Sequence, residues 1–195
     1  RMAELANGNV VVTWSSGAVG ASQQKFGIRT ASGLSVLAET DVNPEDAVNE
    51  TAAGGVVALA DGNFVVMFRR PTDPSAIQGR LFDQDGNALG PRFDISVSLA
   101  NPAAAALQDG RFMVVYDNGN DILGRMMFAG GTPDGAEFII ANAGAIQIDP
   151  AIATLADGRV VVSWTSSELG TSDIFAEIYD PREAGFVNGL LDAIA

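Results

Sequence analysis

The chain has 195 residues, which is long enough to bury a core as one large domain or two small ones. Its composition, 47% hydrophobic and 18% charged residues, is that of a globular protein and excludes a disordered chain. With 24 acidic residues against 11 basic ones, the formal net charge is −13, so we expect no nucleic-acid partner and no anionic membrane surface as a partner.

Two residue types are absent from the chain, cysteine and histidine. The first absence excludes disulfides, thiolate catalysis and Cys-ligated zinc. The second excludes Ser-His-Asp catalysis, His-ligated metals and the commonest general base. No apolar run approaches the length of a membrane span, so we expect no membrane insertion, and the start RMAELANG is not a signal peptide.

One short phrase occurs four times along the chain. Its copies are LANGNVVVTW from Leu5, LADGNFVVMF from Leu59, LQDGRFMVVY from Leu107 and LADGRVVVSW from Leu155. The second copy follows the first by 54 residues, and each later copy follows its predecessor by 48. A period of this length indicates a repeat architecture. Because the sequence begins inside a repeat, we expect it to be a fragment of a longer protein.

The strands of one repeat follow from aligning the copies. NPAAAALQDG from Asn101 matches DPAIATLADG from Asp149, so the run 103–106, which alone reads as helix, is predicted as a strand of small residues. The Asp-Gly or Asn-Gly pair of the phrase, such as Asp157-Gly158, then supplies the positive φ angles of a tight hairpin. The apolar second strand follows, at 160–164 in repeat four.

A third and a fourth strand complete the repeat. The third strand is expected within 24–30 and at 77–82, 122–127 and 174–179. After a second turn, at Asp85-Gly86-Asn87 or Asp134-Gly135, the fourth strand is expected at 93–96 and 138–141. In repeat four only Gly185-Phe186-Val187 is left for this strand.

Four antiparallel strands at this period predict an all-β fold, a β-propeller of four four-stranded antiparallel blades. Small residues suit the crowded innermost strand, and the bulky Phe64, Phe112, Trp14 and Trp164 suit the second strand, where blades pack face to face. We expect one domain over 1–195, with repeats at about 1–49, 50–98, 99–146 and 147–189 and a tail at 190–195. The alternatives are a piece of a larger ring, or half of an eight-bladed ring that a second chain completes, so both a monomer and a homodimer stay open.

The repeat resembles segments of very large secreted bacterial proteins of the RTX (haemolysin-type calcium-binding) group. Those segments have the form L-A-D-G-x-F-V-V-x-W, then I-Y-G-Q-R-F-D-x-D-G-x-x-x-G-x-x-F, and IQGRLFDQDGNALGPRF at 77–93 matches the second half. The resemblance covers all four repeats and is weakest between Ser15 and Asn49. It implies a secreted or cell-surface bacterial protein with a role such as cell adhesion. The calcium-binding nonapeptide G-G-x-G-x-D of the group is absent from this chain, so that device is not carried over.

One string has the alternating oxygen ligands of a calcium loop, Asp83-Gln84-Asp85-Gly86-Asn87. Its glycine is at the fourth place instead of the sixth, and no acid follows at the twelfth. A plain hairpin turn, in which Asp and Asn cap backbone groups, is therefore the favoured interpretation. No motif demands a cofactor, and Ca²⁺ is the one metal ion that the sequence leaves open.

Loops that differ between repeats are the candidates for binding, because the 2–3 and 4–1 connections of propeller blades share one face. The 2–3 connections lie at 15–23, 69–75, 117–121 and 165–173. Their candidate binding residues are Arg69, Arg70, Asp117, Asn118, Asn120 and Asp121. For Trp14 and Trp164 a core role is favoured over sugar stacking, since Phe68 and Tyr116 occupy the same repeat position.

Together these features predict a non-catalytic scaffold or interaction module that binds carbohydrate or protein on its loop face. One alternative is a calcium-dependent hydrolase domain, with acids such as Asp117, Glu168 and Asp173 at the channel mouth. The other is a structural spacer that has no ligand.

Overall fold

The computed structural model describes residues 1–18, 21–45, 50, 55–71, 76–98, 102–142 and 144–182. Every regular element in these ranges is a β-strand, and they contain no helix long and apolar enough to cross a membrane. The strands form four antiparallel sheets, one for each repeat. This confirms the all-β propeller of four antiparallel blades.

Each sheet is a meander in which neighbours in sequence pair with each other. Blade 1 consists of β1 (Met2–Glu4), β2 (Val10–Ser16), β3 (Gln23–Arg29) and β4 (Ser35–Asp41). Blade 2 consists of β5 (Val56–Ala58), β6 (Phe64–Arg69), β7 (Ile77–Phe82) and β8 (Phe93–Ser96). Blade 3 consists of β9 (Ala103–Ala106), β10 (Phe112–Asp117), β11 (Ile122–Met127) and β12 (Phe138–Ala141). Blade 4 consists of β13 (Gln147–Thr154), β14 (Val160–Ser166) and β15 (Asp173–Tyr179).

The strands lie where the repeat alignment predicts them. The alanine run that alone reads as helix is β9, and β7, β8, β11 and β12 have the predicted bounds. The fourth strand expected at 185–187 and the tail at 190–195 lie outside the described residues.

The hairpin turn of the repeated phrase has one geometry in all four blades. Its glycine has a positive φ, 79° at Gly8, 90° at Gly62 and Gly110 and 89° at Gly158. The residue before each glycine does not share the positive φ. Its side-chain oxygen instead accepts a hydrogen bond from the backbone N–H two residues on, as Asp61 does from Asn63 at 3.0 Å. The aspartate therefore stabilises the turn through its side chain, and the glycine provides the left-handed conformation.

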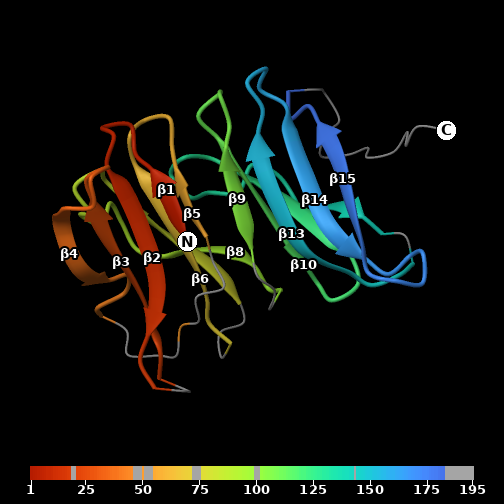
Figure 1. Cartoon of the computed structure of the whole chain (residues 1–195), viewed down its shortest axis with the longest axis horizontal. Coiled ribbons are helices and arrows are strands. Elements are labelled where there is room, and N and C mark those ends of the chain that lie inside the picture. The colour runs from red at the N-terminus through yellow and green to blue at the C-terminus, as the bar shows by residue number, and fades with distance from the viewer. Residues whose placement is uncertain are drawn as a thin grey trace.

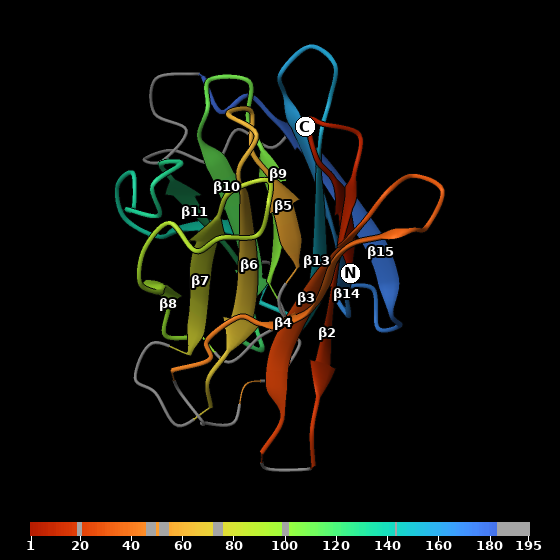
Figure 2. The ribbon, with the colours of Figure 1, turned by 90° about the vertical axis from the view of Figure 1, so that its left-hand side faces the viewer.

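The four innermost strands lie side by side in the order β1, β5, β9 and β13, and successive ones are in contact. Figure 1 shows β2–β4 at one end of this row and β14–β15 at the other. In Figure 2 the sheets of β6–β8 and β10–β11 extend to one side of the inner strands, while β14 and β15 lie on the opposite side. The described blades thus form an open arc, with blade 1 and blade 4 at its ends.

The core is divided into three layers, one between each pair of successive blades. Phe26, Phe64 and Phe82 lie in the first layer, with ring centroids 4.7–5.5 Å apart. Phe112 is fully buried in the second layer, and Trp164 is buried in the third. Phe64, Phe112 and Trp164 lie on second strands as expected, while Phe26 and Phe82 show that third strands contribute bulky contacts as well. Trp14, in contrast, is only partly buried.

Arginines at one repeat position link each middle blade to the blade before it. Arg80 on β7 donates from Nη1 to the carbonyl of Val42 and to the carboxylate of Glu45, both at 2.7 Å. Arg125 on β11 donates in the same way to the carbonyl of Ile95. The blades are therefore joined by polar contacts as well as by apolar ones.

Candidate functional site

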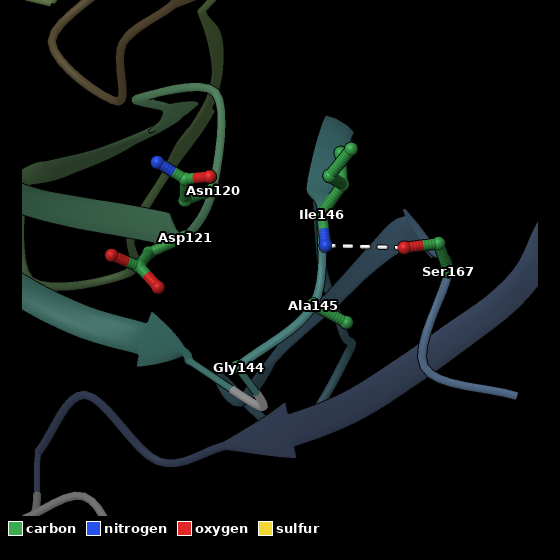
Figure 3. Close-up of a pocket in the computed structure, with 6 residues that line it drawn as sticks. All are labelled: Asn120, Asp121, Gly144, Ala145, Ile146 and Ser167. Carbon is green, nitrogen blue, oxygen red and sulfur yellow. Dashed lines mark hydrogen bonds between the residues drawn. The ribbon is translucent and has the colours of Figure 1, made fainter. Parts of the chain in front are cut away.

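A cavity of about 360 Å³ lies between blades 3 and 4 at the end of the strands where the 2–3 connections are. Its lining comes from the β10–β11, β12–β13 and β14–β15 connections: Asn120, Asp121, Gly144, Ala145, Ile146 and Ser167. Figure 3 shows Asn120 and Asp121 on one side of the cavity, and Ile146 and Ser167 on the other. The 2–3 and 4–1 connections meet at one face here, as the propeller prediction requires.

The loop after β10 is held in shape by its own side chains. Asp117 Oδ1 accepts a hydrogen bond from the N–H of Gly119 at 3.1 Å. Asn118 Oδ1 accepts two more, from the N–H groups of Asn120 at 2.9 Å and Asp121 at 2.8 Å. Gly119 has a φ of 91°, which a residue with a side chain rarely adopts. Asp117 and Asn118 therefore build the turn that places Asn120 and Asp121 beside the cavity.

The opposite wall is tied together by hydrogen bonds that its backbone N–H groups donate. The N–H of Ile146 donates to Ser167 Oγ at 3.1 Å, and the N–H of Ser167 donates to the carbonyl of Ile146 at 3.0 Å. The N–H of Gln147 donates to the carbonyl of Asn120 at 3.0 Å and so joins the two walls. Because Ser167 Oγ accepts from Ile146, its own proton can be donated to a ligand.

Asp117, the last residue of β10, has a half-buried carboxyl group beside this loop. Burial raises the pKa of Asp117 above its usual range, and the nearby carboxylate of Asp149 adds to the rise. Hydrogen bonds from the backbone of Gly119 and Asp149 oppose the shift. Asp149 itself has a φ of 55° and lies where the pairing of β13 with β14 shifts register, so the chain bends at this point.

The six candidate residues from the sequence divide into three pairs. Asn120 and Asp121 line the cavity, while Asp117 and Asn118 shape the loop. Arg69 and Arg70 belong to blade 2: Arg69 is the last residue of β6, and Arg70 is buried, with its N–H bonded to the carbonyl of Ala76 at 2.9 Å. Neither arginine lines this cavity.

Sequence reasoning missed Ala145, Ile146 and Ser167 as candidates. Ser167 lies in the 165–173 connection, which is the counterpart in repeat four of the loop that holds Asp121. Aligning these two connections is the step that would have identified Ser167 as a candidate. Ala145 and Ile146 have no polar group in their side chains, so no chemical motif marks them.

The calcium-like string 83–87 forms the plain hairpin turn that the sequence predicts. Asp83 Oδ1 accepts hydrogen bonds from the N–H groups of Asp85 at 3.0 Å and Asn87 at 2.8 Å, and Oδ2 accepts from Asn87 Nδ2 at 2.9 Å. Burial works against ionisation of Asp83, but the hydrogen bonds from Asn87 and Asp85 outweigh it and lower its pKa. Within the part of the chain that the structure describes, no three acidic side chains gather to hold a metal ion.

A smaller cavity of about 190 Å³ lies at the other end of the strands, among the hairpin turns of the repeated phrase. Its lining includes Gln108, Asp109 and Gly158, which belong to copies of that phrase. Gln108 donates from Nε2 to the carbonyl of Ala156 at 3.1 Å and so joins two turns. These residues form the fold, so the cavity between blades 3 and 4 is the better candidate site.

No family model matches the chain, and no curated protein matches it. Among solved structures, it is similar to a protein of unknown function from Dyadobacter fermentans, with a TM-score of 0.71 and 17% identity over 93% of this chain and 52% of the other. It is also similar to the NanB sialidase of Streptococcus pneumoniae, with a TM-score of 0.63 and 14% identity over 92% of this chain and 30% of the other. A third similar structure is an ulvan lyase, a polysaccharide lyase, with a TM-score of 0.60 and 10% identity over 93% of this chain and 55% of the other.

These likenesses identify the class of fold, a β-propeller. The chain spans about half the length of these structures or less. At identities of 10–17% the comparison shows the fold and no more.

Proposed function

We propose that this chain is a non-catalytic propeller module that binds carbohydrate in the cavity between blades 3 and 4. The observation that carries the proposal is the lining of that cavity by Asn120, Asp121 and Ser167. As in the RTX-type proteins that the repeat resembles, the module would belong to a secreted or surface-displayed bacterial protein.

The chemistry of the lining suits a sugar. The Asp121 carboxylate accepts hydrogen bonds, the Asn120 amide both accepts and donates them, and the Ser167 hydroxyl donates. Sugar hydroxyls need partners of both kinds. Ile146 and Ala145 add an apolar surface for the C–H groups of a sugar ring, and pockets that combine an apolar wall with a few polar groups are typical of ligand sites.

The names of two similar structures give independent support. One is a sialidase and the other an ulvan lyase bound to a saccharide, so both act on carbohydrates. Proteins that share this fold therefore include ones that act on carbohydrates. This support extends to carbohydrate as a class and not to the charge of the sugar, because the saccharide of the lyase contains glucuronate and a sulfated rhamnose.

The charge of the site favours a neutral sugar. None of the six described residues that line the cavity has a positive charge, and Asp121 brings a negative one. The whole chain has a formal net charge of −13. An acidic sugar would be repelled by both, whereas the hydroxyls of a neutral sugar donate well to a carboxylate.

A glycan array tests this proposal. We expect the wild-type chain to bind neutral glycans, and Asp121→Ala to lose at least about tenfold in affinity because a charge-assisted hydrogen bond is lost. The matched control is Asp85→Ala, which removes an exposed acid from a turn remote from the cavity and should bind like the wild type. Absence of any bound glycan, or equal loss in both variants, would refute the assignment.

A further inference from the structure

The two ends of the arc expose sheet faces that are buried everywhere else in the molecule. The end face of blade 4 consists of Val161, Ser163 and Thr165 on β14 and Ile174, Ala176 and Ile178 on β15, which are paired across the two strands. The end face of blade 1 consists of Val10, Val12 and Trp14 on β2. Both sets alternate with residues that point into the core.

The end face of blade 4 has the residues of an interface between blades. Ile174 pairs with Thr165 as Ile122 pairs with Asp117 in blade 3. Ile122 is fully buried against blade 4, and its counterpart Ile77 in blade 2 is fully buried as well, but Ile174 is 76% exposed. Ile178 is 53% exposed, while its counterpart in blade 3, Met126, is fully buried.

The end face of blade 1 shows the same contrast. In blade 2 the counterparts of Val10, Val12 and Trp14 are Phe64, Val66 and Phe68, and all three are fully buried against blade 1. In blade 1 the three side chains are only partly covered. Lys25, which lies opposite Trp14 on the same face, is neutralised by Glu39 at 2.7 Å and Asp41 at 2.9 Å. Arg29, opposite Val10 on the same face, donates to Ser35 Oγ at 3.0 Å and to the carbonyl of Leu37 at 2.7 Å, so both cations of the face have polar partners within blade 1.

The two end faces are complementary to each other. At every junction inside the molecule, the face that corresponds to blade 4's end face packs against the face that corresponds to blade 1's. Within one molecule they lie at opposite ends of the arc and do not meet (Figure 1). A second copy of the chain offers the missing partner for each face.

We propose that two copies of this chain associate head to tail, the end face of blade 4 in each copy packing on the end face of blade 1 in the other. Each copy uses both of its faces, so the two contacts close into a ring with twofold symmetry and leave no face open. We expect the two contacts between copies to pack in the same way as the three buried layers between blades within the chain. Burying Ile174, Ile178 and Trp14 provides the apolar area that drives the association.

Light scattering after size-exclusion chromatography tests this proposal on the whole chain. We expect the wild type to have twice the mass of one chain, and Ile174→Glu/Ile178→Glu to have the mass of a single chain. The matched control is Ile139→Glu, which changes an isoleucine that is 45% exposed on the outermost strand of blade 3, away from both end faces. The control should keep the double mass.

Two additions make the result decisive. Circular dichroism shows whether each variant keeps its β-structure, and Trp14→Glu tests the other end face if the isoleucine variant does not fold. A wild-type chain of single mass, a larger assembly, or a double mass that persists in folded end-face variants overturns the proposal.

Discussion

Each hairpin turn of the repeated phrase depends on one glycine with a left-handed backbone. Gly110 has a φ of 90°, and a Cβ placed on it would meet no atom within 4 Å. The requirement for glycine there is therefore one of backbone conformation alone. The same turn occurs four times, and this explains why the phrase is repeated with so little change.

Gly110→Ala should lower the free energy of unfolding by about 1–2 kcal/mol, the cost of a left-handed conformation for a residue with a Cβ. Urea denaturation measures the loss. Gly130→Ala is the matched control, because Gly130 also has open space around it but no positive φ. Equal effects of the two substitutions would show that backbone strain is not the cause.

Asp117 gives a prediction about pH. Because its pKa is raised in the folded state, the folded chain holds the proton more strongly than the unfolded chain does. The contribution of Asp117 to stability therefore falls as pH rises from about 4, the ordinary pKa of an aspartate, through the raised value. Asp117→Asn keeps an acceptor oxygen and has no such titration.

The measurement is urea unfolding of both chains at pH 4 and pH 7. We expect the gain in stability from Asp117→Asn, relative to the wild type, to be larger at pH 7 than at pH 4. A gain that is the same at both values would mean that the burial of this carboxyl group has no energetic effect.

At the scale of the element, a blade is stable because both of its faces are covered. Each internal layer combines aromatic and aliphatic residues from two neighbouring sheets, and a single meander has no core of its own. Removal of a large side chain from one layer therefore weakens two blades at once.

Phe112→Ala should cost about 3–5 kcal/mol of unfolding free energy, because Phe112 is fully buried in the layer between blades 2 and 3. Chemical denaturation gives the value directly. Phe128→Ala removes the same atoms from a site that is 47% exposed and should cost much less. A similar loss at both positions would contradict the central role of the layers.

At the scale of the whole molecule, the sequence predicts the elements better than their assembly. The strand bounds follow from aligning the repeats, since Ala103–Ala106 becomes a strand only beside Ala151–Thr154. The opening of the arc does not follow, because every repeat encodes the same two faces. The angle between blades depends on packing of side chains that the period does not specify.

Only the part of the site that forms a local pattern in the sequence was predictable. The loop 117–121 is visible in the sequence because polar residues cluster there, and two of them line the cavity. Ala145, Ile146 and Ser167 join them from two other connections that meet only in the folded chain. Arg69 and Arg70 are charged residues in an equivalent connection and are equally conspicuous in the sequence, but they belong to another blade.

The repeated phrase forms the fold, and we propose that the unrepeated loops between blades 3 and 4 bind a carbohydrate ligand. Nitrogen–proton correlation NMR of the labelled chain, titrated with neutral oligosaccharides, tests it most directly. We expect shift changes at Asn120, Asp121, Ala145, Ile146 and Ser167 and none at the hairpin glycines Gly8, Gly62, Gly110 and Gly158. Changes confined to those turns, or no change with any neutral sugar, would contradict it.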